Sequence, residues 1–315
     1  MNLFSKLLKR YSYLLGLILF AFVLLKLNFG EVWQSVENVQ ISYLIIAALA
    51  AFPILFFKSW CWNYILKVQG INYNLKDSFL MYCAGMYLGV PTPGRVGEMA
   101  MAFYLKKDGN SFGKSLVSIF LDRVSDLAFL VGFIILGSLF FVSVWRKEIL
   151  IFFSGLAILA MLVLALTKTG TIKWILKKAF YFFIPEKKQN NWKVNFQDFI
   201  SDFKIFNLKS YTAIMLITAL SWSAYFFQMY VLAWGVGLHV PWIYLSVTVT
   251  ITGLITIIPV SISGIGTRDV ALILLLAPFL IPKEQAIVFS ALILFMSLLA
   301  ALIGLVCWFI KPIKL

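Results

Sequence analysis

Apolar and polar positions alternate along this chain in long blocks. Four uncharged apolar blocks come close to, or exceed, the roughly 20 residues with which an α-helix crosses a bilayer core of about 30 Å. They lie at positions 11–25, 149–166, 213–236 and 286–310. Hydrophobic residues fill 62% of the 315 positions and charged residues only 13%, which lies outside the usual composition of soluble domains. The pattern therefore predicts an all-α polytopic membrane protein.

The basic residues predict how the chain is threaded through the membrane. The formal net charge of +14 comes mostly from lysines in the short polar blocks, and such lysines mark the cytoplasmic side. With a cytoplasmic N-terminus we expect six spanning helices, at about 11–25, 42–66, 115–141, 149–167, 210–235 and 285–310. Residues 26–40 are then a loop outside, and both termini are cytoplasmic. The expected location is the cytoplasmic (plasma) membrane of a prokaryote.

Two further apolar segments are interrupted by glycine and proline. The first, 77–105, contains VPTPGRVGEMA, and the second, 242–282, contains IIPVSISGIGTRDVA. The residues that break the helical pattern are Pro93, Gly94, Gly97, Pro259, Gly264 and Gly266. Proline lacks a backbone donor and glycine accepts most backbone angles, so neither segment is expected to form one continuous helix. Each is predicted to be a helical hairpin, either re-entrant or fully spanning.

The two hairpins enter from opposite sides in this topology, which is typical of inverted-topology repeats whose broken helices meet near the bilayer midplane. We expect a single domain, 1–315, with one repeat at about 1–141 and a second half at 210–315. The alternative is that two packing kinks arose independently. Between the halves, the cytoplasmic segment 168–209 mixes lysines with aromatic residues, which favours an amphipathic segment resting on an anionic lipid surface.

Charged residues also occur inside the apolar segments. A charge near mid-bilayer costs several kcal/mol unless it is paired or hydrated, so these residues are candidate substrate ligands. They are Arg95, Glu98, Asp122, Arg123, Asp126, Arg268 and Asp269, with Lys58 as a further candidate. Helix N-termini after Gly97 and Gly266 are expected to present free N–H groups, and a guanidinium matches phosphate in a bidentate way. Arg95 and Arg268 are therefore the expected phosphate ligands; the alternative is a polar network that only holds helices together.

Three motifs carry a family resemblance. PGRVGE, then a D-R-x-x-D helix about two dozen residues later, then S-G-I-G-T-R-D resemble the flippase-like transmembrane domain of lysylphosphatidylglycerol synthases and its stand-alone relatives. Asp122 and Asp269 stand where the family usually has glutamate, a change that keeps the charge. The resemblance covers nearly the whole chain and implies an inverted-repeat domain that moves a lipid between leaflets. The soluble aminoacyl-transfer domain of those synthases is not expected here, so a separate enzyme would supply any modified lipid.

The leading expectation is therefore flipping or scrambling of a phosphate-bearing lipid, a membrane phospholipid or a polyprenyl-phosphate lipid. The alternatives are a membrane enzyme acting on a polyprenyl-phosphate-linked lipid and an ion-coupled carrier of a small anion. The sequence contains no D-x-D, H-E-x-x-H, G-x-S-x-G or G-x-x-x-x-G-K-[ST] motif. Catalysis, a metal, a cofactor and nucleic acid are accordingly not expected.

Overall fold

The computed structural model describes residues 20–21, 25, 27–139, 201–203, 205–257, 261 and 263–312. Most of these residues are helical, and no β-strand occurs among them. The helices discussed below are α2 (Phe29–Glu37), α3 (Ile41–Leu49), α4 (Ala51–Val68), α5 (Leu75–Gly89), η1 (Pro93–Ala100), α6 (Met101–Lys107), α7 (Phe112–Leu139), α11 (Leu208–Gly235), α12 (Trp242–Ile257), α13 (Thr267–Leu276), η3 (Ala277–Phe279) and α14 (Lys283–Ile310). Most of the predicted helix 11–25, all of 149–167 and most of 168–209 lie outside the described residues.

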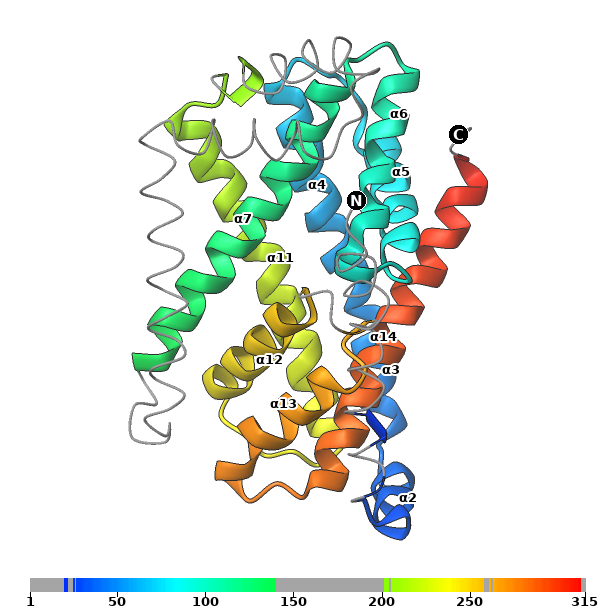
Figure 1. Cartoon of the computed structure of the whole chain (residues 1–315), viewed down its shortest axis with the longest axis vertical. Coiled ribbons are helices and arrows are strands. Elements are labelled where there is room, and N and C mark those ends of the chain that lie inside the picture. The colour runs from blue at the N-terminus through cyan, green and yellow to red at the C-terminus, as the bar shows by residue number, and fades with distance from the viewer. Residues whose placement is uncertain are drawn as a thin grey trace, which may run out of the picture.

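Long helices, among them α4, α7, α11 and α14, form the frame of the molecule (Figure 1). Within the described residues, α3 together with α4, α11 and α14 are each long and apolar enough to cross a membrane. They begin and end within two residues of the predicted spans 42–66, 210–235 and 285–310. Large apolar side chains on these helices face outward, as contact with lipid chains requires; they include Leu216, Leu302, Val306 and Phe309. These observations confirm a helical membrane protein.

The segment 26–40 is not wholly the loop that the sequence analysis predicted, because it contains the helix α2. Asn28 caps this helix by accepting a hydrogen bond from the N–H of Gly30, and Glu31 lies in the first turn, where a negative charge suits the helix dipole. Val32 packs against the core, while Trp33 is exposed. This helix is too short and too polar to cross a membrane, so the pattern of long apolar blocks does not indicate it.

The first hairpin is formed by α5, η1 and α6. The break takes the form of a 3₁₀ helix, and regular α-helix resumes only at Met101. Glycine is required at position 97 because a Cβ atom there would lie 1.9 Å from the carbonyl oxygen of Leu88. The break therefore lets η1 pack directly against the backbone of α5.

The second hairpin is formed by α12, α13 and η3. The predicted breaker Pro259 lies outside the described residues. Gly264 and Gly266 have φ angles of +79° and +83°, in the left-handed region that glycine tolerates best. A Cβ atom on Gly264 would also lie 2.4 Å from the Cγ2 atom of Thr256. These glycines fix the sharp turn into α13.

The two hairpins lie toward opposite ends of the molecule and their breaks meet between them (Figure 1). The Oγ of Ser263 in the second break donates a hydrogen bond of 3.0 Å to the carbonyl of Val90 in the first. At the end that holds the base of the first hairpin, Lys311 pairs with Asp77 at 2.6 Å. Lys67 lies in the last turn of α4, and Lys106 and Lys107 lie in the last turn of α6, and the predicted topology assigns these lysines to the cytoplasmic side. The repeat relationship and the depth of the hairpins in the membrane remain predictions.

Candidate functional site

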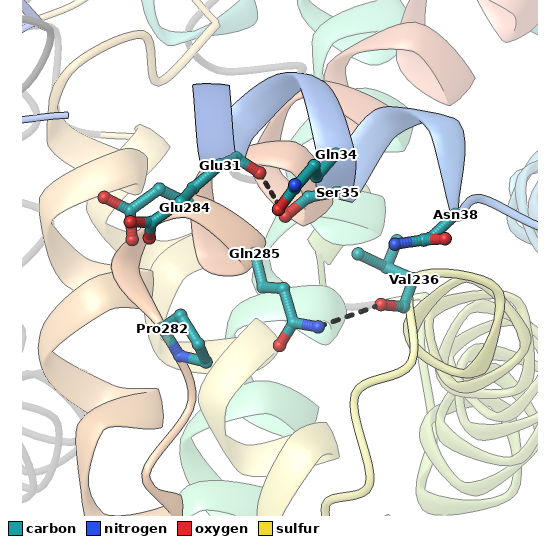
Figure 2. Close-up of a pocket in the computed structure, with 8 residues that line it drawn as sticks. All are labelled: Glu31, Gln34, Ser35, Asn38, Val236, Pro282, Glu284 and Gln285. Carbon is teal, nitrogen blue, oxygen red and sulfur yellow. Dashed lines mark hydrogen bonds between the residues drawn. The ribbon is translucent and has the colours of Figure 1, made fainter. Parts of the chain in front are cut away.

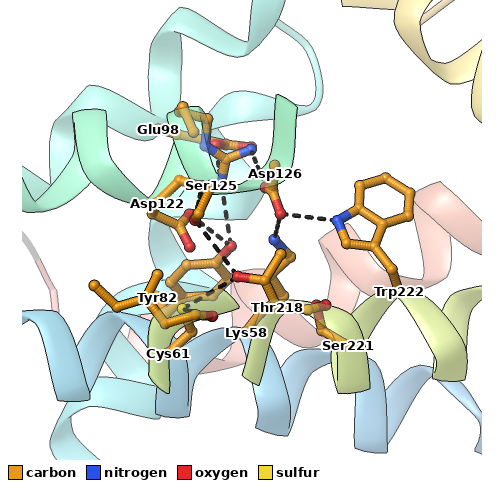
Figure 3. Close-up of polar contacts among 12 residues, drawn as sticks. Lys58, Cys61, Tyr82, Glu98, Asp122, Ser125, Asp126, Thr218, Ser221 and Trp222 are labelled. Atoms are coloured by element: carbon orange, nitrogen blue, oxygen red, sulfur yellow. Dashed lines mark hydrogen bonds and ion pairs between the residues drawn. The ribbon is translucent and has the colours of Figure 1, made fainter. Parts of the chain in front are cut away.

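A group of buried polar side chains lies where α4, α5, η1, α7 and α11 meet, and Figure 3 shows most of its members. We call it the Arg123 cluster. Its members are Lys58, Tyr82, Glu98, Asp122, Arg123, Asp126 and Trp222. Asp122 is the tenth residue after Phe112, the first residue of α7, so the cluster lies about 15 Å along that helix at 1.5 Å per residue. Such a depth places it well inside the apolar part of the fold.

Arg123 lies at the centre of this cluster. Its Nη2 atom is 2.9 Å from an oxygen of Glu98 and 2.9 Å from an oxygen of Asp122, and its Nη1 atom is 3.8 Å from Asp126. It also donates a hydrogen bond of 3.1 Å to the hydroxyl of Tyr82. The Arg123 side chain is 32% exposed, whereas those of Glu98, Asp122 and Asp126 are at most 9% exposed. The cation is thus the accessible member, with its carboxylates behind it.

Asp126 has a second cation of its own. Lys58 forms an ion pair with its Oδ1 atom, and the indole N–H of Trp222 donates a hydrogen bond of 2.9 Å to the same oxygen (Figure 3). The Lys58 ammonium also lies 5.7 Å from the centre of the Trp222 ring, within cation–π range. Asp126 therefore has a cation and a hydrogen-bond donor besides Arg123.

Asp122 has fewer polar contacts than Asp126. Its Oδ2 atom contacts Arg123 and lies 3.4 Å from the Tyr82 hydroxyl, a long hydrogen bond. Its Oδ1 atom is buried and has no hydrogen-bond partner among the residues that the structure describes. Asp122 and Asp126, four residues apart on α7, face the same cluster, as their spacing predicted.

Arg268 and Asp269 form a second, separate group on the other hairpin. The Nε atom of Arg268 donates a hydrogen bond of 2.8 Å to the Oγ of Ser290, which in turn donates to Asp269. A second guanidinium nitrogen donates to the carbonyl of Ser263 at 3.3 Å. Arg268 is 6% exposed and Asp269 is 5% exposed. Within the described residues no ion pair joins this group to the Arg123 cluster.

In the described part of the chain the hydrogen-bond partners of Arg268 are a hydroxyl and a carbonyl, and neither is a carboxylate. One detail of the sequence analysis is wrong at this second group. The N-terminus of α13 was expected to offer free N–H groups. Instead, the carboxylate of Asp269 accepts a hydrogen bond of 2.8 Å from the N–H of Gly266. Asp269 is thus a helix cap.

The first hairpin differs from its prediction in the same way. No α-helix begins directly after Gly97, because the 3₁₀ helix η1 continues to Ala100, and the N–H of Gly97 donates a hydrogen bond of 2.8 Å to the Oγ1 of Thr92. The backbones of Pro93, Gly94 and Arg95 lie in η1. The prediction that the Arg95 side chain binds a ligand falls outside the described side chains.

The structure therefore brings together four of the predicted site residues, Glu98, Asp122, Arg123 and Asp126, with the further candidate Lys58. Sequence reasoning missed Tyr82, Trp222 and Ser290, which complete the two groups. An aromatic residue or a serine is common in apolar segments, so no pattern in a single sequence distinguishes these three. Their roles follow only from the packing of α5, α11 and α14 around the charged residues.

A polar pocket lies elsewhere, under α2 at the opposite end from the base of the first hairpin (Figure 2). Its volume is about 190 Å³, and its lining residues are Glu31, Gln34, Ser35, Asn38, Val236, Pro282, Glu284 and Gln285. The side-chain amide of Gln285 donates to the carbonyl of Val236 across its floor. None of the predicted site residues lines this pocket, so it is distinct from both charged groups.

Comparisons with known proteins agree with this architecture. The family model described as the lysylphosphatidylglycerol synthase TM region matches residues 11–304, which include both hairpins. The chain is also similar to "UPF0104 membrane protein MJ1595" of Methanocaldococcus jannaschii, with 25% identity over 297 residues that cover 87% of each chain. A shorter match, 26% identical over 173 residues, relates 51% of this chain to 50% of "UPF0104 membrane protein PH1989" of Pyrococcus horikoshii. Both names describe a membrane protein and state no activity.

Proposed function

This chain belongs to the family of the lysylphosphatidylglycerol synthase TM region, and on that premise we propose that it moves a phosphate-bearing lipid between the two leaflets of the membrane. The observation that carries the proposal is Arg123. Its guanidinium is partly exposed, lies deep in the apolar part of the fold, and is held by three carboxylates beside a broken helix. A phosphate headgroup is an anion that such a guanidinium binds with two parallel hydrogen bonds.

The shared contacts of Arg123 suit a ligand that must bind and then leave. An arginine in an apolar setting without any counter-charge would be costly and would hold an anion tightly. Here a headgroup exchanges with carboxylates that already neutralise the guanidinium, so the arginine is never left unpaired. The net interaction is the difference between two similar sets of charge-assisted bonds, which favours exchange over trapping.

The meeting of the two hairpins gives the headgroup a route between leaflets in this proposal. Ser263 contacts the carbonyl of Val90 at this meeting point, and Arg268 lies five residues further along, on α13. We propose that Arg95 and Arg268 are further headgroup ligands, with Asp269 fixing the start of α13. The acyl chains stay in the bilayer, alongside the apolar outer surface of the spanning helices.

The proposal involves no chemical change in the lipid, so the protein acts as a transporter and not as an enzyme. Its partners are the transported lipid, an anionic lipid surface at 168–209 and, where the lipid is a modified one, a separate enzyme that makes it. We place the protein in the cytoplasmic membrane with both termini inside. Mass spectrometry of the lipid before and after incubation tests the first point, because an enzyme changes the mass of the lipid and a flippase does not.

The central test is leaflet exchange of tail-labelled fluorescent phosphatidylglycerol in proteoliposomes, read with an impermeant quencher. The wild-type protein should speed exchange over protein-free vesicles, and Arg123→Gln should lower that rate about tenfold or more. Lys107→Gln, at an exposed site at the end of α6, is the matched control and should exchange lipid normally. Arg123→Lys keeps the positive charge but loses the forked guanidinium, so its exchange rate should lie between those of the wild type and Arg123→Gln.

Each variant is first checked for a single symmetric elution peak in detergent, because Arg123→Gln leaves three carboxylates with one cation fewer. Arg123→Lys keeps that cation and covers the case in which the glutamine variant does not fold. Equal exchange rates for wild type, Arg123→Lys and Arg123→Gln would show that Arg123 does not bind the headgroup.

A further inference from the structure

Asp122 is the least well satisfied carboxylate of the Arg123 cluster. Its side chain is fully buried, and its Oδ1 atom has no hydrogen-bond partner in the described part of the chain. Its Oδ2 atom depends on Arg123 at 2.9 Å and on a long contact with Tyr82. Asp126, in contrast, has Lys58 and Trp222. When Arg123 turns to an anionic headgroup, Asp122 loses the ion pair that it forms with Arg123 in the described part of the chain.

The surroundings of Asp122 offer little to replace that cation. The titratable and charged groups that face it are Lys58 and Cys61 from α4, Tyr82 from α5, Glu98 from η1, and Arg123 and Asp126 from α7. Lys58 is already bound to Asp126, and α11 contributes only neutral polar groups. A buried carboxylate without a counter-charge takes up a proton in preference to staying ionised.

We propose that Asp122 is a proton-binding site, and that binding of the lipid phosphate to Arg123 makes this carboxylate take up one proton. This inference rests on the proposed function. The step is balanced: the Asp122 carboxylate accepts H⁺ from water and becomes a carboxylic acid, and it returns H⁺ when the headgroup leaves and Arg123 pairs with it again. Water reaches the site at the partly exposed guanidinium of Arg123, which touches Asp122.

One negative headgroup and one proton then occupy the site together, so the loaded cluster carries the same net charge as the empty one. Lipid and proton therefore cross in the same direction, and transport of a singly charged lipid is electrically neutral. A pH gradient should drive the lipid toward the leaflet that faces the more alkaline side. A membrane potential should have no effect on its distribution.

The experiment uses the same proteoliposomes with a trace of tail-labelled fluorescent phosphatidylglycerol and an imposed gradient of one pH unit. With one proton per lipid, the ratio of labelled lipid between leaflets should shift about tenfold. A potential set by potassium and valinomycin at equal pH should not shift it. Protein-free vesicles under the same gradient measure the passive redistribution of the labelled lipid, which is subtracted.

Asp122→Asn tests the assignment because asparagine has the shape of the protonated acid and cannot titrate. In this variant the final ratio of labelled lipid between the leaflets should no longer depend on the pH gradient, and this ratio is read at equilibrium, so a changed exchange rate does not affect it. Asp108→Asn, at an exposed carboxylate in the α6–α7 connection, should respond like wild type. Asp122→Glu, which restores a titratable group, should respond again and serves as the second variant where the asparagine protein does not fold.

The results separate this inference from the proposed function. If wild-type protein exchanges lipid with no response to the pH gradient, or if Asp122→Asn keeps that response, the proton site is wrong and lipid translocation stands. If Glu98→Gln loses the response and Asp122→Asn keeps it, the proton is bound by Glu98 and the assignment is again overturned. If wild-type protein moves no lipid under any gradient, the proposed function itself fails.

Discussion

Arg123 and Arg268 carry the same guanidinium but have different partners. Arg123 is shared among three carboxylates and is partly exposed, whereas Arg268 is buried and bound by a hydroxyl and a carbonyl. At Arg123 a phosphate can replace a carboxylate at little cost, because one anion replaces another. At Arg268, an arriving phosphate would supply the first anionic partner seen in the described part of the chain.

The Lys58–Asp126 pair offers a test of whether part of the Arg123 cluster is structural. Both side chains are largely buried, so Lys58→Met should leave a buried carboxylate short of its cation and destabilise the protein by about 3–5 kcal/mol. The double variant Lys58→Met/Asp126→Leu removes both charges and should recover most of that loss. Thermal unfolding in detergent measures the stability of the single and the double variant, with the exposed Lys107→Met as control.

Lipid exchange by the double variant adds the functional side of this test. Normal exchange would mean that Lys58 and Asp126 only hold α4, α7 and α11 together, while lost exchange in a stable protein would place them in the transport path. A single variant that unfolds at the wild-type temperature would contradict the ion pair itself.

The sequence predicts which residues belong to the charged site, but it does not predict their contacts. Glu98, Asp122, Arg123 and Asp126 stand out in the sequence because a charge in an apolar segment is costly and needs a reason. Which partner each one takes depends on how α4, α5, α7 and α11 pack, and no residue spacing encodes that packing. Asp269 is an example: the structure shows that it caps its own helix by accepting a hydrogen bond from the N–H of Gly266.

At the scale of helices and hairpins, the break in the first hairpin depends on a close backbone contact. Gly97→Ala would place a Cβ atom 1.9 Å from the carbonyl oxygen of Leu88, a backbone atom that cannot simply rotate away. The variant should lower folded yield or separate η1 from α5, and with it displace Glu98 from Arg123. Yield of monodisperse protein and lipid exchange measure the two effects.

Gly132→Ala is the matched control for this change. Gly132 lies within α7 with no atom near the added Cβ, and alanine is favoured over glycine in a helix by about 1 kcal/mol. It should be neutral or slightly stabilising. If Gly97→Ala folds and exchanges lipid as well as Gly132→Ala does, the contact between η1 and α5 is not needed.

The helices themselves were the most predictable level. The predicted spans 210–235 and 285–310 match α11 and α14 to within two residues, because a spanning helix must be long and apolar. Glycine and proline located both hairpin breaks for a physical reason that does not depend on the rest of the fold. The helix α2 was missed since its stability comes from a cap and from packing of Val32, and the 3₁₀ form of η1 depends on tertiary contact with α5.

At the scale of the whole molecule, the distribution of charge and the opposed hairpins together predict on which side of the membrane each hairpin begins. The base of the first hairpin lies at the lysine-rich end, and the base of the second lies at the other end (Figure 1). If lysines mark the cytoplasmic side, the two bases must face different compartments. A protein whose halves were not inverted would present both bases on one side.

Cysteine labelling with an impermeant maleimide tests this arrangement in intact cells. Cys61, Cys83 and Cys307 are buried, so the wild-type protein should react little. Lys107→Cys, at an exposed site at the end of α6, should react only after the cells are opened. Leu280→Cys, at a residue that is 91% exposed after η3, should react from outside. If both sites react from the same side, the hairpins are not opposed, and a headgroup could not pass from one to the other across the membrane.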